Sequence, residues 1–256
     1  MAAERRHTLY FLGETRAFSP VFLDSEIDMT AVLGHRAAER EAGRALSVVS
    51  YVVHAVGRAM ARHPEANAAV RGRFRPRLAK YAEVSTKVTF DKTMNGHRIV
   101  LSAVLPGAQD ATLGEIQDWL EARREGDPAS APEFAAVRLL HRMPAWLGRP
   151  AFRLRARSLA QRQALFGTVA VTSLGHRPVD GFHSVGGTTV TFGVGRIADR
   201  PVVRERQVTA APVMRLSMAF DHRVIDGAEA ADLLADVKAG LEGFDGVTTA
   251  RTRTLP

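Results

Sequence analysis

The stretch VMRLSMAFDHRVIDGAEAADLLADVKAGLE, residues 213–242, decides the fold. Its first half alternates along the chain, with one apolar face formed by Met214, Leu216, Met218 and Phe220. A period of two predicts a strand. Its second half carries an apolar stripe at helical spacing, formed by Ala230, Leu233, Leu234, Val237 and Leu241. The segment DHRVIDG, residues 221–227, therefore joins the end of a strand to the start of a helix.

Two polar residues in this junction have both a chemical and a structural interpretation. His222 stands at the strand end, where a histidine suits general-base chemistry near neutral pH. Most single histidines, however, are simply surface or core residues. Asp226 is placed to cap the following helix, with Glu229 completing a capping box. Spacing alone leaves both interpretations open.

The rest of the chain interleaves strands and helices. Alternation over FSPVFLDSEIDM, residues 18–29, predicts a strand, and residues 84–90 and 99–105 predict two more, joined through Asn95-Gly96. Helices are expected at 46–60 and, from a Thr112–Glu115 capping box, at 112–125. From Phe166 onward the chain becomes rich in strands. Without a strict repeating alternation, this order favours an α/β sandwich over a barrel.

Residues 131–165 differ in charge from the rest of the chain. Glu133 is their one acidic residue, against seven arginines at positions 138, 142, 149, 153, 155, 157 and 162. We expect two helices here, separated by breaks at Pro144, Gly148 and Pro150. Three functions fit the charge: docking an acidic carrier protein or the phosphates of coenzyme A, lying on an anionic membrane surface, or merely covering apolar surface.

Composition excludes several other classes of protein. With no cysteine, the chain can form no disulfide, thiolate zinc site or iron–sulfur site, and no metal is expected. Residues 1–17 lack the apolar core of a signal peptide, and the apolar run at 46–60 is too short to span a bilayer, so we expect a cytoplasmic protein. The aromatic residues are not interleaved with the arginines as a nucleic-acid stacking platform.

Four segments, in order, resemble the catalytic domain of the 2-oxo-acid dehydrogenase (dihydrolipoamide) acyltransferases: residues 5–30, HPEANA at 63–68, GVGRIADRPVV at 193–203 and DHRVIDG at 221–227. The resemblance implies the chloramphenicol-acetyltransferase-like fold, a two-layer α/β (α+β) sandwich with a mixed sheet flanked by helices. It also implies a homotrimer with active sites between subunits. On this basis residues 1–17 would form an arm, 18–245 the catalytic domain with an insertion at about 131–165, and 246–256 a flexible tail.

The same resemblance implies roles for individual residues. His222 would be the general base, and Thr172 of a neighbouring subunit would donate a hydrogen bond to the oxyanion of the tetrahedral intermediate. Asp226 would support the site by pairing with an arginine. The remaining candidates, expected to contact the substrate or cofactor, are Ser173, Gly175, Arg223 and Gly227.

The chain departs from the family pattern in ways that affect its substrates. Ser173 replaces an asparagine, and Pro20-Val21-Phe22 lacks a family histidine. No lipoyl or subunit-binding domain precedes residue 18 in this sequence, so we expect the acyl group to arrive on coenzyme A, on the pantetheine of a carrier protein, or on lipoamide. Because the C-terminal tail is polar, we do not expect the trimers to assemble into larger cubic or dodecahedral cores.

We therefore predict an acyltransferase that moves an acyl group from a thioester donor to a thiol. Three alternatives stay open: a hydroxyl or amine acceptor, a catalytically inactive trimeric scaffold, and a basic binding module acting through residues 131–165.

Overall fold

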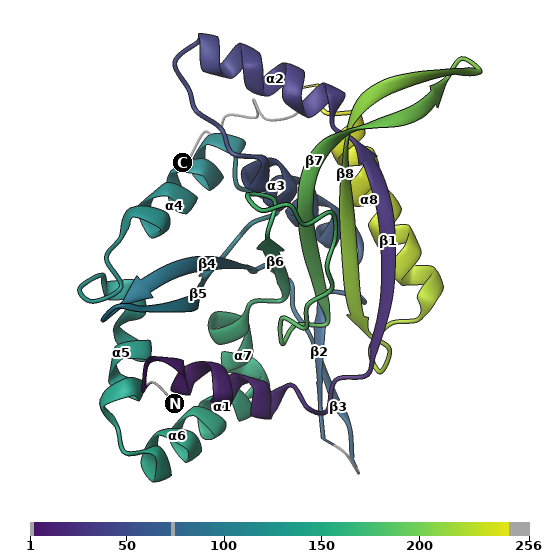
Figure 1. The fold of residues 1–256 in the computed structure, drawn as a ribbon. Helices are drawn as coiled ribbons and strands as arrows, with labels where there is room; N and C mark the ends of the chain where they lie inside the picture. The colour runs from purple at the N-terminus through teal and green to yellow at the C-terminus, as the bar shows by residue number, and fades with distance from the viewer. Residues whose placement is uncertain (1–2, 73–74, 246–256) are drawn as a thin grey trace, which may run out of the picture.

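A computed structural model describes residues 3–72 and 75–245. Its centre is a six-stranded mixed sheet with the order β1-β8-β7-β6-β4-β5 (Figure 1). The strands are β1 (Pro20–Asp28), β4 (Thr86–Met94), β5 (His97–Leu105), β6 (Val169–Ser173), β7 (Val190–Arg204) and β8 (Gln207–Asp221). Strand β6 runs parallel to β4 and β7, and the other neighbours are antiparallel. The mixed sheet predicted from the sequence is confirmed.

One face of the sheet holds the core. The apolar side of β8 is fully buried there, as are Val190 and Phe192 of β7. They pack with the helices α3 (Val48–Arg62), α4 (Leu113–Glu125) and α8 (Gly227–Glu242), while α2 (Thr30–Glu41) packs against α8. The helical stripe of α8 is buried as its periodicity predicted. The predicted capping box also forms, since Thr112 and Glu115 bond each other's backbone N–H.

A loop, residues 174–189, covers the opposite face beside β7. At Gly193 an added Cβ would lie 2.2 Å from the carbonyl oxygen of Phe182, and at Gly195 it would lie 1.9 Å from that of Asp180. Only glycine permits so close an approach of two backbones. The glycines of GVGRI thus fix this loop on the sheet.

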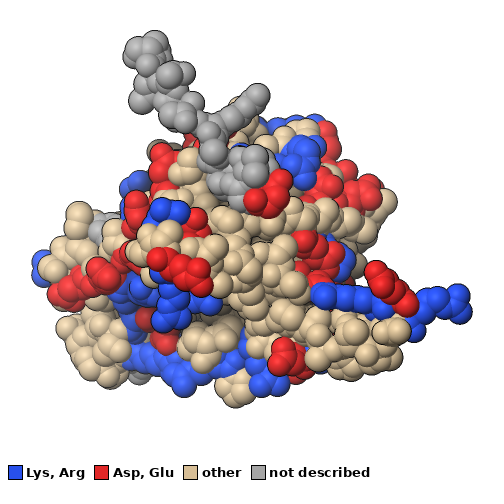
Figure 2. Space-filling view, turned by 90° about the horizontal axis from the view of Figure 1, so that it is seen from above, with Lys and Arg blue, Asp and Glu red and all other residues tan. Residues whose placement is uncertain are grey.

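Strands β7 and β8 continue beyond the sheet as a two-stranded arm (Figure 1). The turn at its tip is formed by Glu205 and Arg206, both with positive φ. Val203 and Val208, paired across the arm, are each more than 70% exposed. Figure 2 shows basic side chains gathered at its outer end.

A second group of helices lies at the β5 end of the molecule (Figure 1). It comprises α1 (Arg6–Glu14), α5 (Ala135–Arg142), α6 (Ala145–Arg157) and α7 (Leu159–Phe166), preceded by the short 3₁₀ turns Ala3–Arg5 and Pro132–Phe134. Helices α5 to α7 are the basic segment of the sequence. A small hairpin, β2 (Ala68–Arg71) with β3 (Arg77–Lys80), completes the fold.

Three expectations about these elements need correction or extension. The helix expected to break at Gly148 and Pro150 runs through both as α6, and the chain breaks at Pro144, as expected, and at Ser158. Residues 6–14 of the expected arm form a helix that packs on α5 and α6. Helix α2 and the β2–β3 hairpin were not predicted. The tail expected at 246–256 lies outside the described residues.

Within the described ranges, no helix is long and apolar enough to cross a membrane.

Candidate active site

His222 lies just beyond the end of β8 and is accessible. Its backbone N–H donates to the Ser19 carbonyl at 3.0 Å, which ties the turn to the start of β1. The side chain is 47% exposed, and its Nδ1 lies 3.5 Å from Asp226 Oδ1. Among the described residues, no group hydrogen-bonds to Nε2. A carboxylate at Nδ1 favours the tautomer that leaves the lone pair on Nε2, the form that a general base requires.

The side chain of Asp226 does not have the capping role expected from the sequence. It holds the N-cap position of α8, which begins at Gly227, but its side chain caps no backbone N–H. The expected capping box is wrong, because Glu229 instead accepts a hydrogen bond from His63 Nδ1 at 2.9 Å. Within the described part of one chain, Asp226 pairs with His222 and with no arginine, so its expected arginine partner stays a prediction.

Asp221 is the carboxylate that pairs with an arginine. It is buried and binds the Arg223 guanidinium twice, with Nε–Oδ1 at 2.8 Å and Nη2–Oδ2 at 2.5 Å. The hydrogen bond to Asp221 raises the pKa of Arg223. This bidentate pair fixes the backbone on both sides of His222.

Thr172 lies near the end of β6 beside a groove. Thr89 on β4 donates from Oγ1 to Thr172 Oγ1 at 2.7 Å. Because that bond fills an acceptor site, the Thr172 hydroxyl hydrogen stays available to donate to a substrate oxygen. The next residue, Ser173, accepts from the Gly175 N–H at 3.3 Å and lines a groove of about 390 Å³ with Thr89, Gln117 and His176.

One chain does not bring His222 and Thr172 together. The sheet register places Thr172 level with Gly193 and Ser217. Ser217 precedes His222 by five residues on an extended chain. Thr172, which is level with Ser217, therefore lies about 16 Å from His222 along the strand direction. A site that uses both residues therefore needs a second copy of the chain.

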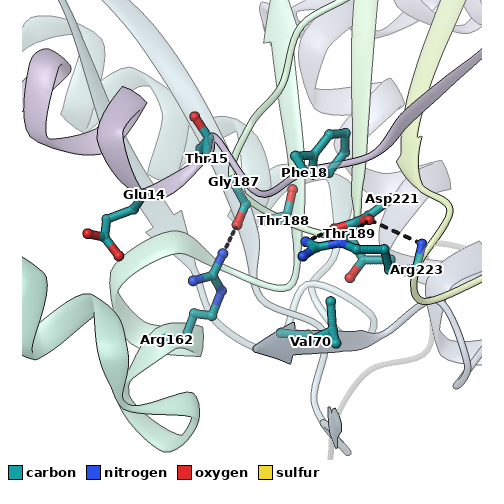
Figure 3. A pocket seen from close by; sticks show the side chains of 11 residues that line it. Glu14, Thr15, Phe18, Val70, Arg162, Gly187, Thr188, Thr189, Asp221 and Arg223 are labelled. Carbon is teal, nitrogen blue, oxygen red and sulfur yellow. Dashed lines mark hydrogen bonds and ion pairs between the residues drawn. The ribbon is translucent and has the colours of Figure 1, made fainter. Parts of the chain in front are cut away.

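A pocket adjoins the His222 turn (Figure 3). Its wall includes Arg162, Asp221 and Arg223, together with Glu14 of α1 and the backbone of Gly187. Arg162 donates to the Gly187 carbonyl at 2.7 Å. Of the sequence candidates only Arg223 lies here. Arg162 appeared in the sequence merely as one of seven arginines, and only the fold shows that it approaches the site.

Lys87 is a second residue that the sequence did not single out. It lies on β4 with its side chain buried, and Nζ donates to the Gly186 carbonyl next to this pocket. The ammonium lies 4.7 Å from the ring centroid of Phe11 and 5.7 Å from that of Phe166. Burial, with a smaller effect from Arg162, lowers the pKa of Lys87 to about 7.

The fold is that of the chloramphenicol-acetyltransferase-like class. A solved chloramphenicol acetyltransferase superposes with a TM-score of 0.51 at 18% identity, covering 94% of this chain and 98% of the other. Dihydrolipoamide acetyltransferase from Azotobacter vinelandii gives a TM-score of 0.69 at 18% identity, covering 92% and 86%.

Within this class the chain is similar to the 2-oxoacid dehydrogenases acyltransferases over part of its length. Residues 147–248 match the model of that family's catalytic domain. The acetyltransferase component of the pyruvate dehydrogenase complex of Bacillus subtilis (strain 168) is 25% identical over 225 residues, which cover 85% of this chain and 43% of the relative. The chain thus spans less than half the length of that protein. The resemblance predicted from the sequence motifs is confirmed.

Proposed function

We propose that this protein transfers an acyl group between a thioester and a thiol, at sites shared by neighbouring copies of the chain. The observation that carries the proposal is the accessible His222, oriented by Asp226 at the end of the strand that leads into DHRVIDG. The family match over residues 147–248 supports the same reaction.

In the proposed mechanism, His222 Nε2 takes the proton from the acceptor thiol. The thiolate attacks the thioester carbonyl carbon, and the resulting oxyanion accepts a hydrogen bond from the Thr172 hydroxyl of the adjoining copy. When the intermediate collapses, the carbon–sulfur bond to the donor breaks and His222 returns its proton to the leaving thiolate. Asp226 is 90% exposed, so solvent screens its charge and its contribution is chiefly orientation.

The related protein from Azotobacter supports these roles. Its structure was solved to study a serine, a histidine and an asparagine in the catalytic mechanism, with the asparagine four residues after the histidine. His222 and Asp226 have the same spacing, and Thr172 precedes His222 by about the same 50 residues as that serine. A closed ring of three copies would place each His222 against a neighbour's Thr172 groove.

For substrates, we propose an acyl group exchanged between lipoamide or another pantetheine-like thiol and coenzyme A. The name of the B. subtilis relative specifies acetyl transfer to or from a dihydrolipoyllysine residue. Each of these molecules acts as a substrate and none as a resident cofactor. Docking of an acidic lipoyl or carrier protein along Arg138–Arg162 stays a prediction. Within this stretch the Arg138 guanidinium donates a hydrogen bond to the Ala131 carbonyl at 2.6 Å.

The test is complementation between two inactive chains. His222→Ala should lower acyl transfer from acetyl-CoA to dihydrolipoamide by ~10²–10⁴-fold, and Thr172→Ala by on the order of 10². Co-expressed with different tags and purified through both, the two variants should regain activity. In a ring of three copies that contains both variants, about one site in three combines intact His222 with intact Thr172.

The controls separate the rival functions. Oligomers that contain both variants and stay as inactive as either parent would overturn the shared site. Full activity of His222→Ala would overturn the proposed chemistry. Absence of thiol acylation by the wild type, with acylation of a hydroxyl or amine acceptor instead, would replace it with the alternative acceptor class.

A further inference from the structure

Two arginines from separate parts of the chain line the pocket beside His222: Arg223, which follows β8, and Arg162 of α7 (Figure 3). A third, Arg71, ends β2 directly after the lining residue Val70. Arg71 donates from Nη1 to the Ala156 carbonyl at 3.3 Å, which brings it against the C-terminal turn of α6. The C-terminal half of α6 carries Arg153 and Arg157, four residues apart and therefore on one helix face.

Carboxylates are too few to neutralise this group. Asp221 is engaged by Arg223 in the bidentate pair. Glu14, at the end of α1, lies 3.5 Å from Arg153 Nε, and of the described carboxylates only Glu14 raises the pKa of either Arg71 or Arg162. Between Glu133 and Asp180 the sequence contains no acidic residue.

Like charges therefore lie close to one another beside the pocket. Burial lowers the pKa of Arg71 and of Arg162, and each is lowered further by the other arginines, Arg157 and Arg153 for Arg71 and Arg71 and Arg223 for Arg162. Arg162 uses one of its five N–H donors on the Gly187 carbonyl. Clustered guanidinium groups with free donors are the usual recognition element for phosphate, which they bind through paired hydrogen bonds.

We propose that Arg153, Arg157 and Arg162 bind a phosphate group of the thiol or thioester substrate, so that the protein selects phosphorylated pantetheine compounds at the His222 side of its site. The inference rests on the proposed acyl transfer. It follows from position, because the wall of the pocket includes both residues that flank His222. Lipoamide carries no phosphate, so we assign it to the Thr172 groove of the adjoining copy. Helices α6 and α7 of the basic segment thereby acquire a role in substrate recognition.

The test compares three donors with the same acetyl-pantetheine thioester and increasing phosphate content. Acetyl-pantetheine has none, acetyl-4′-phosphopantetheine has the one shared with carrier proteins, and acetyl-CoA adds the nucleotide phosphates. Arg153→Gln/Arg157→Gln should raise KM for the phosphorylated donors by roughly tenfold per lost charged hydrogen bond, and leave acetyl-pantetheine unchanged. An effect already complete with acetyl-4′-phosphopantetheine identifies the shared phosphate, whereas an effect confined to acetyl-CoA identifies the nucleotide phosphates.

Two further variants control for charge and structure. Arg155→Gln removes one charge from the same helix, but its side chain points away from the Arg153–Arg157 face, and it should change no KM. Glu14→Gln removes the competing carboxylate and should lower KM for acetyl-CoA. Equal losses with all three donors, or an Arg155 effect as large as that of the double variant, would overturn the proposal.

Binding of adenosine 3′,5′-bisphosphate, measured by calorimetry on the wild type and the double variant, separates this proposal from the proposed function. Binding lost in the double variant supports an anion site even if no donor is turned over, and then only the proposed reaction fails. Binding that the double variant keeps, together with unchanged KM values, overturns the anion site while the acyltransferase proposal stands.

Discussion

The unit β8–α8 and the helices α5–α7 differ in where their large apolar side chains lie. In α8 and the part of β8 that lies within the sheet, the apolar residues are buried, and Met214, Leu216, Met218 and Phe220 are fully so. In α5–α7 large apolar side chains face outward, with Leu139 60%, Trp146 77% and Leu154 75% exposed. The first region is held by burial, while the second combines ring contacts such as Phe152 with Phe166 with polar bonds to its neighbours.

This difference explains which part of the molecule carries which task. General-base chemistry needs a fixed histidine, and the buried strand before His222 supplies that rigidity. The basic helices combine charge repulsion with little buried apolar surface, so their stability depends on what binds them. Loss of one side chain should therefore have very different consequences in the two regions.

The largest predicted effect separates the two regions by stability alone. Phe220→Ala should lower the free energy of unfolding by ~3–5 kcal/mol, because it leaves a cavity under the sheet. Trp146→Ala, which removes a larger but exposed ring, should change it by less than about 0.5 kcal/mol. Urea unfolding followed by circular dichroism measures both. Similar losses for the two variants would show that α6 packs into the core of the protein.

The sequence predicted β8–α8 well because its pattern and its packing agree. A strict alternation followed by a helical stripe permits one arrangement on a buried face. In the basic segment the break expected at Pro144 is confirmed, but the one expected at Pro150 is wrong, because α6 accommodates that proline within the helix. The β2–β3 hairpin has four residues in each strand, too few for a pattern to emerge.

In the candidate site, too, some residues were predictable from the sequence and others were not. His222 and Thr172 were found through motifs, but their separation within one chain depends on sheet register, which no local motif encodes. Thr89 and Lys87 carried no signal, because each looks like an ordinary residue of a strand until β6 and the 174–189 loop are placed beside it. Asp226 was misassigned because a capping sequence and a histidine partner compete for one carboxylate.

Lys87 lies on β4 next to Phe166 of α7, and should make the junction between the sheet and the basic helices sensitive to pH. Its folded pKa of about 7 is below the unfolded value of ~10.4, so between these values the unfolded chain binds more protons. Stability should therefore rise with pH from about 7 to 10, by on the order of 2–4 kcal/mol. Lys87→Met should abolish this rise and be more stable than the wild type at pH 7.

Denaturant midpoints at half-unit pH intervals measure the effect. Lys80→Met, which removes an exposed lysine that pairs with Glu65, is the matched control and should keep the wild-type slope. A rise of equal size in the Lys87 variant would mean that another group titrates there. A destabilised Lys87→Met at pH 7 would mean that the bond to the Gly186 carbonyl outweighs the cost of burying the ammonium.

The smallest effect tests how the basic helices are attached. The Tyr81 hydroxyl donates to the Leu159 carbonyl at 2.7 Å, a polar tie between the segment after β3 and the start of α7. Tyr81→Phe should cost ~0.5–1.5 kcal/mol, the range for one hydrogen bond. Hydrogen exchange should accelerate in α6 and α7 and stay unchanged in β8. Tyr51→Phe is the matched control: it removes the 2.8 Å bond to His35 beside the core, and its loss should appear in the slowest-exchanging amides of the sheet. If Tyr81→Phe accelerated exchange in β8 as much as in α7, the two regions would unfold as one cooperative unit, and the basic helices would owe their stability to the core after all.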